Sequence, residues 1–131
     1  MRHILWNPKS ANGQEAAFGM LGLETALSIV QKTMVDSGLM SWELVAERMS
    51  HAPARIGGYE EQGQKISKGS FANLVVINPT KSWRVDRDLV LSNSSNTPYH
   101  GHELPGFVEY TLFKGKQTVI NGAVVSKGAQ Q

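Results

Sequence analysis

The first long amphipathic stretch of the chain predicts a helix from Leu21 to Val35. Its apolar residues recur at i, i+3, i+4, i+7 and i+11, which is one face of a helix with 3.6 residues per turn. These residues are Leu23, Ala26, Leu27, Val30 and Met34. Gly38 follows and is predicted to end the helix, because glycine adopts a left-handed conformation there at little cost.

Two shorter helices are expected next. Ser41 is placed to cap a helix whose apolar stripe runs from Trp42 to Met49. Ser50 is predicted to cap a second one, with Pro53 in its first turn and Gly57-Gly58 at its end.

The second half of the chain reads as strands. Leu74–Ile77 is a continuous apolar run rich in β-branched residues, which predicts a buried strand. The stretch 83–91 is predicted to be a short strand or turn region with residues 86–88 pointing outward. Segments 107–113, 117–120 and 123–125 predict a meander, because Lys114-Gly115-Lys116 and Asn121-Gly122 are turn signals. The expected fold class is therefore α+β, with helices followed by a small antiparallel β-unit.

Composition bounds the class of protein. The chain has 131 residues, enough for one modest domain but too few for a (β/α)8 barrel of about 250 residues. The net charge of +2 comes from scattered basic residues, so we expect no nucleic-acid partner. No apolar run approaches the roughly 18 residues of a membrane span, and there is no cysteine. These features predict a cytoplasmic chain that binds no membrane.

The residues by themselves assign no catalytic group. His100 and His102 have the spacing of a metal pair, but they lie in a turn-rich loop with no third ligand in view, and three protein ligands are the usual minimum for zinc. His51 stands beside a helix cap, where a surface or capping role is expected. No Ser/His/Asp or Cys/His set is present to supply a nucleophile.

Several motifs carry a family resemblance. The run FGMLGLETAL at 18–27 resembles the segment of type I dihydroorotases, members of the amidohydrolase superfamily, that follows their last metal-ligand motif. Residues 49–57, 63–79 and 96–106 also resemble that family, and the similarity continues to about Gly122. It implies the C-terminal portion of such an enzyme, lacking most of the catalytic barrel. Residues 1–14 would then be an unmatched tail, 15–58 the last barrel helices, 59–125 part of the small β-domain and 126–131 a polar tail.

The resemblance implies a substrate-binding role for two residues. In dihydroorotases the backbone of a Phe-Gly pair lines the substrate pocket, and that pair maps onto Phe18 and Gly19. The family reaction is the reversible hydrolysis of (S)-dihydroorotate to N-carbamoyl-L-aspartate in pyrimidine biosynthesis, with zinc held by His, Asp and a carboxylated Lys. The Asp-His-Ala-Pro-His motif expected near the N-terminus is absent, since the first aspartate is Asp36, and His3 is given no role. We therefore expect the chain alone to hold no zinc and to be inactive.

Two alternatives stay open. The chain could derive from a dihydropyrimidinase, hydantoinase or allantoinase. It could instead be a non-catalytic scaffold, like the metal-free dihydroorotase homologues that support aspartate transcarbamoylase, which would make that enzyme a partner.

If most of the barrel is missing, we expect some surfaces of this chain to lack the neighbours that would cover them. Leu74–Ile77 should lie at an unpaired sheet edge. Leu23, Leu27, Val30 and Met34 should face nothing of their own, which predicts a marginal monomer that self-associates.

Overall fold

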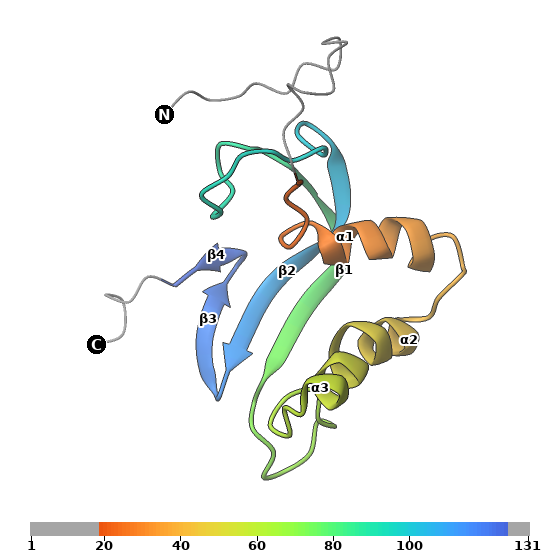
Figure 1. Cartoon of the computed structure of the whole chain (residues 1–131), viewed down its shortest axis with the longest axis vertical. Coiled ribbons are helices and arrows are strands. Elements are labelled where there is room, and N and C mark those ends of the chain that lie inside the picture. The colour runs from red at the N-terminus through yellow and green to blue at the C-terminus, as the bar shows by residue number, and fades with distance from the viewer. Residues whose placement is uncertain (1–18, 126–131) are drawn as a thin grey trace.

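The computed structural model describes residues 19–125. Helices occupy the first part of that range, and a four-stranded antiparallel sheet occupies the second, in the strand order β1-β2-β3-β4 (Figure 1). This confirms an α+β arrangement with a small antiparallel unit. The predictions for residues 1–14 and 126–131, and for His3 and Phe18, lie outside the described residues.

The sheet is built on two long strands, β1 (Leu74–Arg84) and β2 (Glu103–Phe113). A loop of residues 85–102 connects them, and their register places Leu74 opposite Leu112 and Arg84 opposite Glu103. Among the described strands β1 pairs with β2 alone, so the prediction of an unpaired edge is confirmed. The strand was predicted over Leu74–Ile77 only, and that bound was wrong, because β1 continues through Pro79 to Arg84. Proline fits an edge strand where the ladder is already interrupted, and here the register shifts between Asn78 and Ser82.

The remaining strands confirm the predicted meander. β3 (Lys116–Ile120) and β4 (Ala123–Val124) follow β2 through two-residue turns. The turns have the same backbone conformation: Lys114 and Asn121 both have φ of 50°, and Gly115 and Gly122 both have φ of 80°. Positive φ at both central positions is what a tight hairpin turn requires, and Asn-Gly and Lys-Gly supply it.

The first helix differs from its prediction in start and in orientation. It consists of α1 (Ala26–Val30) and a π-helical turn η1 (Gln31–Val35), so it begins about five residues later than predicted. It ends as expected at Gly38, whose φ is 77°. The face buried against the sheet is polar: Thr25, Ser28 and Gln31 are each 3–4% exposed. The apolar residues Leu23 and Met34 are 93% and 36% exposed.

The second helical region is one rod rather than two helices. α2 (Trp42–Ala46), the π-helical turn η2 (Glu47–His51) and α3 (Ala52–Gly57) follow one another without a break. Ser41 caps the start as predicted, since its hydroxyl accepts the Leu44 N–H at 3.3 Å, and Gly58 ends the rod with φ of 70°. Ser50 does not begin a new helix. The wider π turn accommodates Pro53, which lacks an N–H, without ending the helix.

The core of the described chain is small. Its most deeply buried large side chains, Leu104 and Val85, are each 1% exposed and lie where the 85–102 loop joins β1 and β2. The prediction that Leu74–Ile77 is buried was wrong, because Val75 and Val76 are 50% and 44% exposed. The helix α1 covers one part of the sheet, and the described residues supply no second layer over this part of β1.

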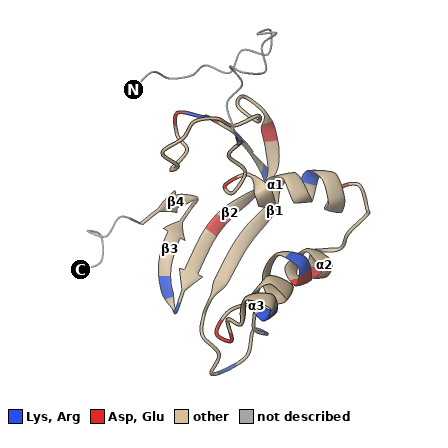
Figure 2. Ribbon diagram, in the orientation of Figure 1, with Lys and Arg blue, Asp and Glu red and all other residues tan. Residues whose placement is uncertain are grey.

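Charges are spread over the elements rather than gathered in one region (Figure 2). The turn at residues 86–88 agrees with its prediction only in part: Asp88 is exposed as expected, whereas Asp86 and Arg87 are half-buried. Within the described part of the chain, none of the helices combines the length and the apolar character that crossing a membrane requires.

Candidate functional site

The loop before α1 is attached to the loop that precedes β2. The Leu21 N–H donates to the Asn96 carbonyl at 2.8 Å, and the Asn96 side-chain amide donates to the Gly19 carbonyl. Gly19 is exposed, has φ of 78° and has no described atom within 4 Å of where a Cβ would stand. The backbone at Gly19 is thus held in place while its surroundings stay open.

Helix α1 is attached to the sheet by hydrogen bonds from its buried polar face. The Trp83 indole N–H donates to Ser28 Oγ at 2.9 Å, and that hydroxyl donates to the Gly106 carbonyl at 3.0 Å. One turn further on, the Gln31 side-chain amide donates to the Pro79 carbonyl at 2.8 Å. Gly106 has no side chain to obstruct this contact, whereas a Cβ there would lie 2.5 Å from Gln31 Oε1.

A groove of about 370 Å³ lies beside this attachment. Apolar side chains from α1, the 85–102 loop, β2 and β4 form most of its wall. They include Leu27, Leu89, Leu91, Phe107, Val108 and Val124. The polar groups at the groove are Ser28, Trp83 and Glu24, and the Glu24 carboxylate accepts the Leu91 N–H at 3.1 Å. The groove therefore borders both the helix and the loop that holds Gly19.

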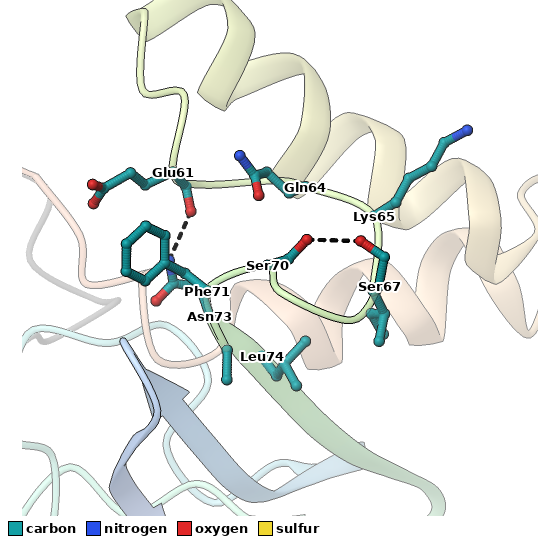
Figure 3. Close-up of a pocket in the computed structure, with 10 residues that line it drawn as sticks. Glu61, Gln64, Lys65, Ser67, Ser70, Phe71, Asn73 and Leu74 are labelled. Carbon is teal, nitrogen blue, oxygen red and sulfur yellow. Dashed lines mark hydrogen bonds between the residues drawn. The ribbon is translucent and has the colours of Figure 1, made fainter.

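A smaller pocket of about 110 Å³ lies at the connection between the helical rod and β1 (Figure 3). Ser67, Ser70 and Phe71 are among the residues that line it, and the two serine hydroxyls are 2.8 Å apart. The Asn73 side chain donates to the Glu61 carbonyl at 2.7 Å and accepts the Lys114 N–H at 2.7 Å. An aspartate could not make the first of these bonds, so this asparagine holds the connection between rod and hairpin.

The histidine pair does not fit a zinc site. His100 Nδ1 accepts the Arg87 N–H at 3.1 Å, so its lone pair is occupied, and the Asp86 carboxylate lies 3.9 Å away. His102 is exposed, with its ring edge-on to that of Tyr99 at a centroid distance of 6.1 Å. Across residues 19–125, the structure brings together no group of three or more His, Cys, Asp or Glu side chains able to hold a metal ion.

His51 occupies a structural position. Its Nδ1–H donates to the Gly63 carbonyl, which connects the helical rod to the loop that follows it. Gly63 has φ of 60°, and a Cβ there would lie 2.8 Å from the Ser50 carbonyl oxygen. The ring thus holds a closely packed backbone crossing, instead of the surface or capping position expected for it.

Solved structures similar to this chain include two hydantoinases. An L-hydantoinase (dihydropyrimidinase) from Arthrobacter aurescens matches 86% of the chain with a TM-score of 0.77 and 29% identity. A D-hydantoinase matches 85% of it with a TM-score of 0.73 and 25% identity. The matched segments are 25% and 24% of those proteins. The arrangement of rod, helix and sheet is therefore that of a segment of an amidohydrolase.

The similar curated sequences define the class further. The dihydroorotase of Streptomyces coelicolor is 48% identical over 114 residues, and that of Mycobacterium leprae is 50% identical over 100 residues. These matches cover 87% and 76% of this chain but 27% and 23% of the relatives, so the chain spans about a quarter of their length. No family model matches the chain. The chain is a homologue of dihydroorotases over most of its length.

Sequence reasoning found part of this site. It singled out Gly19 and the Asn96–Gly106 segment by resemblance, but it gave Asn96 no role. It also missed Ser28 and Trp83. A signal for Ser28 was present, because Glu24, Ser28 and Gln31 recur at i, i+4 and i+7 and so form a polar stripe on one helix face.

Proposed function

We propose that the chain is the C-terminal part of a dihydroorotase-like amidohydrolase, and that the backbone at Phe18 and Gly19 lines its substrate pocket. The observation that carries this proposal is the attachment of the Gly19–Leu21 loop to Asn96, because it joins two segments that each resemble dihydroorotases. The open space around Gly19 leaves room for a ligand to approach the backbone.

The degree of sequence identity to dihydroorotases and to hydantoinases supports a substrate class. Identity to the dihydroorotases is 44–50% for three of the similar curated proteins, against 25–29% for the two hydantoinases. These values support (S)-dihydroorotate and N-carbamoyl-L-aspartate as substrates, in pyrimidine biosynthesis and hence in the cytoplasm, rather than hydantoins. In this proposal α1 and the rod are the last helices of the barrel, and residues 59–125 belong to the small β-domain.

The chemistry requires groups from outside the described residues. Zinc would activate the attacking water and polarise the amide carbonyl. Because residues 19–125 do not assemble its ligands, we propose that this chain contributes binding and orientation only. Gly19 would present its backbone to the substrate, and Asn96 would hold that backbone.

The test is a chimera in which this chain replaces the matching quarter of the Streptomyces coelicolor dihydroorotase. We expect the chimera to hydrolyse dihydroorotate with zinc, and the isolated chain to be inactive and to hold no stoichiometric zinc. Gly19→Val should raise KM, since the new side chain would enter the space proposed for substrate. Gly38→Val is the matched control, because Gly38 has φ of 77° and is also free of neighbours within 4 Å.

Two results would contradict the proposal. A folded chimera without turnover would favour the scaffold interpretation, with aspartate transcarbamoylase as the partner to examine. Turnover by the isolated chain with added metal, abolished by His100→Ala, would show that the chain carries its own centre.

A further inference from the structure

Residues 19–31 and 79–96 are joined by a series of hydrogen bonds that runs in antiparallel order. Gly19 and Leu21 bond to Asn96, Glu24 to Leu91, Ser28 to Trp83 and Gln31 to Pro79. As the residue number rises on one segment, it falls on the other, through 96, 91, 83 and 79. We call this set of contacts the polar seam.

The polar seam explains why the helix is docked by a polar side and not by its predicted apolar stripe. Glu24, Ser28 and Gln31 form a stripe displaced by one residue, or about 100°, from the stripe of Leu23, Leu27, Val30 and Met34. Apolar contacts are non-directional and would tolerate rotation of the helix about its axis. Hydrogen bonds from buried side chains do not tolerate it, because a buried donor or acceptor that loses its partner is strongly disfavoured.

The most buried side chains of the polar seam are those of Ser28 and Gln31. Ser28 is 3% exposed, and its hydroxyl both accepts from Trp83 and donates to Gly106, so it uses its one proton and a lone pair. It therefore connects the helix to β1 and β2 at once. Gln31 is equally buried, and its Oε1 has no hydrogen-bond partner among the described residues, so it contributes a single bond of this kind.

We propose that Ser28 and Trp83 are positioning residues for the Gly19–Leu21 loop. They set the rotation of α1 about its axis and its position along the sheet. The Glu24–Leu91 and Leu21–Asn96 bonds then fix the position of Gly19 relative to the docked helix. The positioning of the loop is argued from the hydrogen bonds of the polar seam alone. The effect on substrate binding rests on the proposed function.

The experiment is hydrogen–deuterium exchange mass spectrometry on the full chain at low micromolar concentration. Ser28→Ala should speed exchange about five- to tenfold in peptides covering 19–25 and 88–93, which contain the Leu21 and Leu91 amides. Peptides covering 42–57 and 116–125 should be unchanged. Trp83→Phe keeps an aromatic side chain but removes the N–H donor together with the five-membered part of the indole, and it should act in the same direction with a smaller effect.

Thr33→Ala is the matched control. It also removes a hydroxyl that donates to a backbone carbonyl, that of Ile29 at 2.7 Å, but on the exposed side of the same helix. We expect it to leave exchange at 19–25 and 88–93 unaltered. Equal acceleration in all four peptides would show a purely structural role for Ser28 and overturn the proposal. The proposal would also be overturned if neither Ser28→Ala nor Trp83→Phe accelerated exchange.

The chimera separates this inference from the proposed function. If the parent chimera is active, Ser28→Ala should raise KM severalfold with a smaller change in kcat, whereas an unchanged KM would overturn the link to substrate. If the parent chimera is inactive, the proposed function fails, and the exchange results still decide whether Ser28 and Trp83 position the loop.

Discussion

At the scale of single residues, the fold depends on a few contacts that sequence patterns do not contain. Phe107 packs so closely against the β3–β4 turn that a Cβ on Gly122 would lie 2.2 Å from its ring. Lys81 covers the same ring, with its Nζ 3.6 Å from the centroid. The turn, the aromatic ring and the bulged part of β1 are therefore packed together, and Gly122 is needed both for its backbone conformation and for its lack of a side chain.

Gly122→Ala should lower the free energy of unfolding by about 2–5 kcal/mol, as the sum of left-handed strain and overpacking against Phe107. Gly115→Ala is a matched comparison, because Gly115 has the same φ of 80° in an equivalent turn and a Cβ there would meet no described atom within 4 Å. It should lower that free energy by about 1–2 kcal/mol, from strain alone. Urea denaturation measures the free energy of unfolding of both variants, and an equal decrease in the two would contradict the packing argument.

At the scale of elements, the helical rod is stabilised in part by contacts between its own residues. Ser41 caps its first turn, and Arg55 pairs with Glu47 at 3.0 Å across the π turn, although both side chains are largely exposed and the pair contributes little. The Ser41 hydroxyl, and next the backbone N–H of Glu43, lower the pKa of the Glu43 carboxyl from its ordinary value of 4.5. Ionised Glu43 therefore favours the folded rod above that ordinary value, and this contribution is lost as pH falls through the lowered pKa.

Ser41→Ala should raise the pKa of Glu43 toward its ordinary value, because the largest cause of the shift is removed. Loss of the cap should also destabilise the rod by about 1 kcal/mol. The pKa is measured by NMR titration of the side-chain carboxyl, and stability by the helical circular dichroism signal. Ser37→Ala, an exposed hydroxyl near the end of the preceding helix, should leave the Glu43 titration unchanged.

At the scale of the whole molecule, the described chain exposes much apolar surface. Leu23, Ile56 and Leu89 are 93%, 85% and 78% exposed, and none of the four helix residues expected to lack cover is fully buried. Leu27 and Val30 are half-buried, so the helix forgoes less stabilisation from apolar burial than it would if all four side chains were fully exposed. Self-association remains the prediction for the isolated chain, since monomers seldom tolerate large apolar patches.

Leu23→Gln should weaken self-association about tenfold and leave the unfolding midpoint of the dilute chain unchanged, because this side chain contributes almost no burial within one chain. Leu104→Ala should act on stability instead and destabilise the fold by about 2–5 kcal/mol, since Leu104 is 1% exposed. Sedimentation velocity over a concentration series measures the first effect and thermal unfolding the second. A monomeric parent chain at every concentration would contradict the association argument.

The sequence by itself determined the elements that depend on neighbours along the chain. The Ser41 cap, the glycine ends of the helices and the two hairpin turns were all predictable, because capping and positive φ are properties of a few consecutive residues. The family resemblance likewise located Gly19. The tertiary structure decided which faces are buried. The polar stripe of α1 packs on the sheet because Trp83, Gly106 and Pro79, which are 48–78 residues away in the chain, present partners for it. β1 continues past Pro79 for a similar reason, since a place at the sheet edge is set by its neighbours in space and not by its own residues.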